Sequence, residues 1–157
     1  MAPADTTEFV LATLKATSAV TDLVMAGASG IFETGELDAD QLAGVEEDRR
    51  EAGDPAKILA ILVRDAGEKA ENEMQHTQRV EVYLYDRERG YANIRLARKQ
   101  VRLALKDQST ALDDPLTGRG VMEALFFEER SGHLTDRWSN LDYEQIIFEA
   151  LVSLDHG

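Results

Sequence analysis

Residues 79–107, RVEVYLYDRERGYANIRLARKQVRLALKD, contain the two segments that decide the fold. From residue 79 to residue 86 apolar and polar side chains alternate, with Val80, Val82 and Leu84 on one face. Alternation with a period of two is typical of a strand with one buried face. A short charged turn containing glycine follows, and helical periodicity begins directly after it. This stretch therefore predicts a strand, a turn and a helix in direct succession.

The helix predicted over residues 91–107 carries three kinds of side chain on three faces. The apolar residues expected to face the sheet are Ile94, Ala97, Val101, Ala104 and Leu105. The basic stripe beside them consists of Arg95, Arg98, Lys99, Arg102 and Lys106. Leu96 and Leu103 are seven residues apart and fall on a third face, away from the expected core. Such leucines are either covered by neighbouring loops or form an interface with another subunit.

Shorter signals predict the remaining elements. Six consecutive apolar residues, 58–63, indicate a strand over residues 57–64 that is covered on both faces. A helix from about Glu8 and a very short strand at residues 31–32 are expected before it. The last two predicted strands are residues 121–130 and 143–154. The segments expected to be loops are residues 66–78, 108–120 and 131–142.

These elements predict an α+β fold with two layers. The strands at 57–64 and 79–86 can pair as antiparallel neighbours, and so can those at 121–130 and 143–154. The expected result is a mostly antiparallel sheet of four to five strands. The long helix and the amino-terminal helix are expected to pack on that sheet.

The composition fits one domain with a hydrophobic core. The chain has 157 residues, of which 43% are hydrophobic and 30% are charged. We predict a single domain over residues 1–157, with an acidic excursion at 33–54 and a frayed tail at 155–157. The absence of cysteine excludes disulfides and thiolate metal sites. No apolar run reaches the roughly 18 residues that span a bilayer, and the amino terminus does not read as a signal peptide.

The charge is strongly negative and unevenly distributed. The net charge of −13 disfavours a generic nucleic-acid-binding domain, which would normally be basic. Residues 86–106 carry a net +5, whereas residues 33–54 carry −7 and residues 107–157 carry −8. Separate basic and acidic segments allow copies of the chain to pair through opposite charges. The alternative is that these charges only solvate the surface, where exposed pairs contribute about 0–1 kcal/mol.

The sequence contains no recognisable catalytic or metal-binding pattern. His76, His133 and His156 are the only histidines, and none has the spacing of a metal motif. Asp38 and Asp40 begin like a calcium loop, but the following positions lack the required glycine and acid. We therefore expect no catalytic residues, no cofactor and no metal, and a protein that is not an enzyme.

Several motifs appear in an order found in one family. Gln75-His76-Thr77 precedes the alternating strand, and Gly90-Tyr91-Ala92 opens the amphipathic helix. The supporting segments are the apolar turn 20–24, the strand Ile31-Phe32, the strand 58–63 and residues 137–148, which contain Trp138 and Phe148. In this order the chain resembles the tail terminator, or tail-completion, proteins of long-tailed bacteriophages. The resemblance covers most of residues 8–154 and rests on hydrophobic patterns.

The resemblance implies a structural role in the virion. Such proteins form a ring, typically hexameric, at the head-proximal end of the tail tube, where they end tube polymerisation. The implied partners are other copies of the chain, the tail tube protein and the head-neck connector proteins, with no membrane. The implied location is the virion, and the host cytoplasm during assembly. DNA would pass through the lumen without specific binding, because an acidic wall repels phosphate.

Two sets of residues are the candidates for contact in such a ring. The subunit-interface candidates are Arg95, Leu96, Arg98, Arg102 and Leu103. The candidates for contact with the tube or neck are Asn72, Glu73, Gln75, His76, Glu36, Asp38 and Asp40.

Three other functions stay open at the level of sequence. A head-completion or neck connector protein would also be a small ring former, and its binding partner would distinguish it. A small acidic enzyme would need a deep pocket that holds His76 or His133 beside two carboxylates. An inhibitor that imitates DNA would need its acids at phosphate spacing on one face, but a basic helix interrupts them.

Overall fold

The computed structural model describes residues 2–33, 57–86, 91–114, 118–136 and 141–154. The helical elements are α1 (Thr6–Ala16), α2 (Ser18–Thr21), the 3-10 turn η1 (Gly27–Gly30) and α4 (Tyr91–Leu105). The strands are β1 (Ile31–Glu33), β2 (Ala60–Ala70), β3 (Gln75–Asp86), β4 (Thr110–Asp114), β5 (Gly118–Arg130), β6 (Leu134–Thr135) and β7 (Asp142–Leu154). Nearly all of the predicted acidic excursion and the predicted frayed tail lie outside the described residues.

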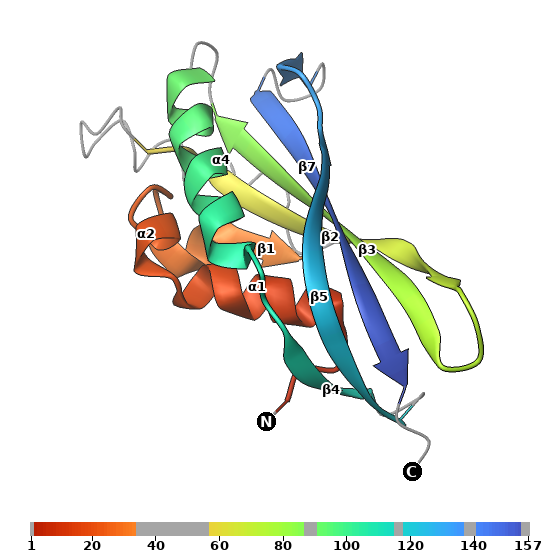
Figure 1. Ribbon diagram of the computed structural model, residues 1–157. Coiled ribbons are helices and arrows are strands. Elements are labelled where there is room, and N and C mark those ends of the chain that lie inside the picture. Colours follow the sequence, from red (N-terminus) through yellow and green to blue (C-terminus); the bar gives the residue numbers. More distant parts are fainter. Residues whose placement is uncertain (1, 34–56, 87–90, 115–117, 137–140, 155–157) are drawn as a thin grey trace.

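The strands form one mixed sheet in the order β1-β2-β3-β7-β5-β4, with β6 also pairing with β7 (Figure 1). The predicted antiparallel pairs, β2 with β3 and β5 with β7, are confirmed. The sheet has more strands than predicted, because β4 and β6 add to it. It also contains a parallel pair, β1 with β2, beside its antiparallel pairs. The α+β prediction therefore holds in its broad class.

Three segments predicted as loops contain strands. Residues 66–78 form most of a hairpin, because β2 continues to Ala70 and β3 begins at Gln75. The segment at 108–120 contains β4, and the segment at 131–142 contains β6. In each case a partner strand satisfies the backbone hydrogen bonds, which outweighs the polar composition that indicated a loop. Within the hairpin the pairing shifts register between Asp65 and Glu68, where Gly67 has a φ of +103° that favours glycine.

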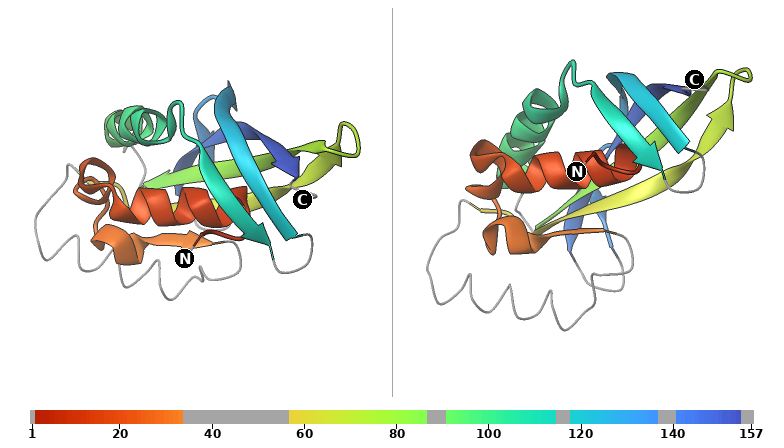
Figure 2. Two further views of the ribbon diagram at one scale, coloured as in Figure 1. Left: turned by 60° about the horizontal axis from the view of Figure 1, so that its bottom comes forward. Right: turned by 90° about the horizontal axis from the view of Figure 1, so that it is seen from below.

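The helices α1 and α4 lie on the same side of the sheet, and together with the sheet they enclose the core (Figures 1 and 2). The predicted sheet-facing residues of α4 are buried, except that Ala104 is half-buried. Alternate residues of β3 and β7 are buried opposite the helices, as the period of two predicts. Residues from both helices and from these strands belong to a single hydrophobic cluster.

The β4 end of the sheet bends back toward the amino terminus. The Asp113 amide donates a hydrogen bond of 2.9 Å to the carbonyl of Pro3, just before α1. At the start of α1, the Asp5 carboxylate accepts a hydrogen bond from the Glu8 amide and caps the helix. Among the described residues, no helix is long and apolar enough to cross a membrane.

Candidate functional site

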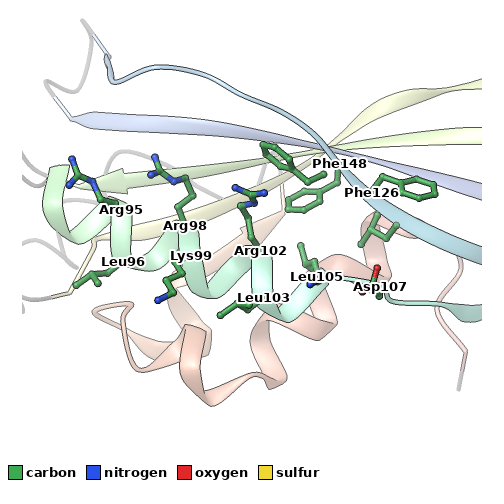
Figure 3. A pocket seen from close by; sticks show the side chains of 13 residues that line it. Arg95, Leu96, Arg98, Lys99, Arg102, Leu103, Leu105, Asp107, Phe126 and Phe148 are labelled. Atoms are coloured by element: carbon green, nitrogen blue, oxygen red, sulfur yellow. The ribbon is translucent and has the colours of Figure 1, made fainter.

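A groove with a cavity volume of about 690 Å³ lies between α4 and β5 (Figure 3). All five predicted subunit-interface residues line it, and Lys99, Phe126 and Phe127 are among its other lining residues. Five of its lining residues are basic and one, Asp107, is acidic. The groove therefore combines apolar surface with positive charge.

The pairing of β5 explains why this side of the molecule is open. Its first residues, from Gly118 to Met122, pair with β4 on one edge. Beyond Met122, β5 pairs only with β7 among the described residues, so its other edge has no neighbouring strand. The register of β5 also shifts twice, after Met122 and after Phe127. The helix α4 thus borders a bulged stretch of β5 that pairs with β7 on one edge and with no other described strand.

Large apolar side chains are exposed at the groove. Leu96 and Leu103 are 53% and 56% exposed, and Phe126 on β5 is 55% exposed. The helical periodicity correctly placed the two leucines away from the core. Phe126 was missed, since the sequence of β5 contains no periodic signal that distinguishes its exposed residues from its core residues.

One of the predicted interface residues has a role within the fold. Arg98 Nη1 lies 2.9 and 2.7 Å from the two carboxylate oxygens of Glu144, which is fully buried on β7. Arg130 Nη1 lies 3.4 Å from the same carboxylate. The sequence placed Arg98 in the basic stripe without a partner, and the structure adds that its side chain is largely buried and compensates a buried acid.

The other basic residues that line the groove are directed to the surface. The guanidinium of Arg102 lies 3.8 Å from the ring centroid of Phe127, and that of Arg95 lies 4.9 Å from the Tyr91 ring. Lys99 and Lys106 are exposed beside them. Within the described part of the chain, none of these four side chains forms an ion pair. Their charge is therefore available to a partner, and stacking holds the two arginines in place.

The second set of predicted contact residues is divided between two environments. Asn72 and Glu73 are exposed at the turn of the β2–β3 hairpin. His76 is buried in β3 rather than placed in a polar loop, and its Nε2 lies 3.2 Å from Gln78 Nε2 and 3.6 Å from a Glu68 carboxylate oxygen. Gln75 begins β3 and is half-buried. The other three candidates, Glu36, Asp38 and Asp40, lie outside the described residues.

Each of the two described histidines lies close to an acidic side chain. His133 Nε2 is 3.1 Å from Asp142, and the His133 ring stacks on Tyr91 with a centroid separation of 4.5 Å. In the described part of the chain, one carboxylate lies within ion-pairing distance of each of His76 and His133, whereas the enzyme alternative calls for two. Among the described residues, no three histidine or acidic side chains gather as a metal site would require.

The face of the sheet opposite the helices carries a tyrosine cluster that the sequence interpretation missed. The rings of Tyr85 and Tyr143 stack with centroids 5.3 Å apart, and Tyr83 lies 6.2 Å from each of them. Burial, together with the nearby Asp136 carboxylate and the neighbouring tyrosines, raises the pKa of Tyr85 to about 12. Cross-strand pairing of Tyr85 with Tyr143 could be found only once the register of β3 and β7 was known.

Comparison with known proteins gives a structural relative only. Searches with protein-family models and against curated protein sequences find no match. Among solved structures, the chain is similar to a chain of the virion of a native gene transfer agent (GTA) particle. The two share 14% sequence identity, the TM-score is 0.60, and the alignment covers 92% of each chain. At this level of identity the likeness shows that the two chains share a fold.

Proposed function

We propose that this chain is a structural protein of a phage-like virion that forms a ring at the head-proximal end of a tail tube. The observation that carries the proposal is the fold shared over 92% of both chains with a component of a gene transfer agent virion. The order of sequence motifs supports the same assignment independently, since it resembles that of the tail terminators. In this role the ring ends tube growth and provides the joint to the head-neck complex.

The groove supports self-association, which a ring requires. It exposes leucine and phenylalanine side chains beside four basic residues that form no ion pair with another described residue, whereas the chain as a whole carries a net charge of −13. Exposed apolar residues gathered in one groove are typical of an interaction site. A second copy of this acidic chain offers many carboxylates to the basic groove. Two copies therefore attract each other at this surface, although their net charges repel.

The proposed partners follow from this location. One face of the ring contacts the tail tube protein, and the other contacts the head-neck connector proteins. DNA passes through the lumen without specific binding, because an acidic wall repels phosphate. This last point requires that acidic residues line the lumen, and it fails if they all lie on the outer rim.

A capping assay tests the proposal. The purified full-length chain is added to growing tubes of the cognate tail tube protein, and tube lengths are measured by negative-stain microscopy. We expect shorter tubes that carry a ring at one end. Unchanged tube lengths, with binding to a portal or adaptor ring instead, would overturn the tube-terminating role and assign the chain to the neck.

Matched variants connect the assay to the groove. The double variant Leu96→Asp with Leu103→Asp places charge on the apolar residues of the groove, and we expect it to abolish rings and capping. The control is Leu134→Asp, which alters a leucine that is 38% exposed on β6 and does not line the groove. Capping by both variants would show that the groove is not the subunit interface.

A further inference from the structure

We propose that the turn of the β2–β3 hairpin, residues 71–74, docks into the α4–β5 groove of the next copy of the chain. This inference rests on the proposed ring and specifies which two surfaces meet in it. The occupant of the groove is thus a second copy of the chain. One copy contributes its hairpin turn to the contact, and the other contributes its groove.

The hairpin turn is already ordered in the free chain. The Asn72 side-chain oxygen accepts hydrogen bonds from the amides of Met74 and Gln75, at 2.8 and 2.9 Å. The Glu71 amide donates to the Gln75 carbonyl at 3.0 Å, and the Leu154 amide of β7 donates to the Met74 carbonyl at 2.7 Å. A turn held in this way loses little conformational entropy when it docks.

The chemistry of the turn complements that of the groove. Glu71 and Glu73 are exposed acids, and Met74 is 50% exposed between them and the start of β3. The groove presents Lys99 and Lys106 for the acids. It presents leucine and phenylalanine side chains for the methionine, whose flexible thioether adapts to irregular apolar surfaces and contacts aromatic rings favourably.

The turn and the groove are separate surfaces of one molecule. The hydrogen bond from the Leu154 amide to the Met74 carbonyl holds the turn at the Gln75 end of β3. None of residues 71–74 lines the groove of the same molecule. In Figure 1 the hairpin projects past one end of the helical layer, and α4 starts at the opposite end.

A contact between two different surfaces repeats from one copy to the next. Such a heterologous contact closes into a ring when the rotation between copies divides a full turn, as the proposed function requires. A symmetrical contact of groove with groove would instead yield a dimer and would oppose two basic surfaces. The charges of the groove therefore favour the head-to-tail arrangement.

Crosslinking tests the contact directly, because the natural chain contains no cysteine. We combine Glu71→Cys and Leu103→Cys in one chain and treat the assembled protein with a short bismaleimide. We expect a ladder of covalent species that ends at the subunit number of the ring. The matched control, Glu71→Cys with Leu134→Cys, should remain monomeric on a denaturing gel. Dimers formed by Leu103→Cys alone would reveal groove-to-groove contact and overturn the inference.

A charge exchange provides a second test that does not depend on crosslinker reach. Reversal of the turn (Glu71→Lys with Glu73→Lys) and reversal of the groove (Lys99→Glu with Lys106→Glu) should each raise, several-fold, the concentration at which rings form. An equimolar mixture should recover assembly, since each reversed turn then meets a reversed groove and each native turn a native one. Mixing without recovery would contradict the contact.

These tests separate the inference from the proposed function. Closed rings without crosslinks would support the proposed ring but contradict the contact between hairpin turn and groove. Crosslinked chains of indefinite length without closed rings would retain the contact and reject the ring. A chain that stays monomeric at every concentration and ignores tail tubes would reject both.

Discussion

At the scale of single residues, the ion pair between Arg98 and Glu144 gives a helix-surface arginine a role within the fold. The sequence places Arg98 in a basic stripe, and only the packing of α4 against β7 shows that it compensates a buried acid. No local pattern could reveal this, because the two residues are 46 positions apart. Arg102 and Lys99, which the sequence places in the same basic stripe, are exposed and line the groove.

The ion pair predicts a large stability difference between neighbouring arginines. Arg98→Ala leaves the Glu144 carboxylate buried with only a distant contact to Arg130, and we expect a loss of about 3 kcal/mol in the free energy of unfolding. Arg95→Ala removes an exposed stacking contact and should cost less than about 1 kcal/mol. Urea denaturation of both variants measures the difference. Equal stabilities would contradict the structural role of Arg98.

The raised pKa of Tyr85 predicts a loss of stability at alkaline pH. In the unfolded chain its phenol ionises near pH 10, whereas in the folded chain burial raises its pKa to about 12. The folded state therefore binds more protons between these values, and stability falls as pH rises through that window. In Tyr85→Phe the free energy of unfolding should fall less steeply with rising pH, whereas in Tyr91→Phe it should fall as in the natural chain. A fall of the same steepness in Tyr85→Phe would show that other groups cause it.

At the scale of elements, the long helix was predicted well and the strands around the hairpin less well. The periodicity of residues 91–107 correctly separated the buried face from the exposed leucines, because a helix sets both faces locally. The hairpin at residues 66–78 was predicted as a loop, since its order depends on pairing between β2, β3 and β7. For the same reason the groove was not predicted as a groove: it needs α4 and β5, which the sequence could not place side by side.

The two faces of α4 predict that shortening a buried side chain lowers the free energy of unfolding far more than shortening an exposed one. Ile94→Ala empties a fully buried position and should lower the free energy of unfolding by about 3 kcal/mol. Leu96→Ala shortens an exposed side chain and should change it by less than about 0.5 kcal/mol. Thermal or urea unfolding at low protein concentration, where subunits are separated, provides the comparison. A large loss for Leu96→Ala would mean that this leucine packs within the subunit.

At the scale of the whole molecule, the central feature is a charge distribution that favours contact between unlike surfaces. The chain is acidic overall, yet its one described groove with exposed leucines is lined by basic residues. The broad fold class and the absence of catalytic motifs could be derived from the sequence. For the proposed ring, the subunit number and the assignment of each face depend on how copies would meet, which surface geometry sets rather than local sequence pattern.

The electrostatic part of that contact predicts a dependence on salt. Exposed charges on the groove and on the hairpin turn are screened over about 10 Å at roughly 0.1 M salt and over shorter distances above it. We therefore expect the concentration at which rings form to rise as salt is added. Light scattering across a salt series measures it. Assembly that strengthens with salt would instead indicate a contact dominated by apolar burial.

The most direct test of the account is the mass of the full-length chain in solution, measured by light scattering after size exclusion, with negative-stain images of each peak. The account predicts closed rings of one defined mass, formed by the chain alone or on addition of tail tubes that supply part of the assembly energy. A monomer at every concentration, unchanged by tail tubes, would contradict it.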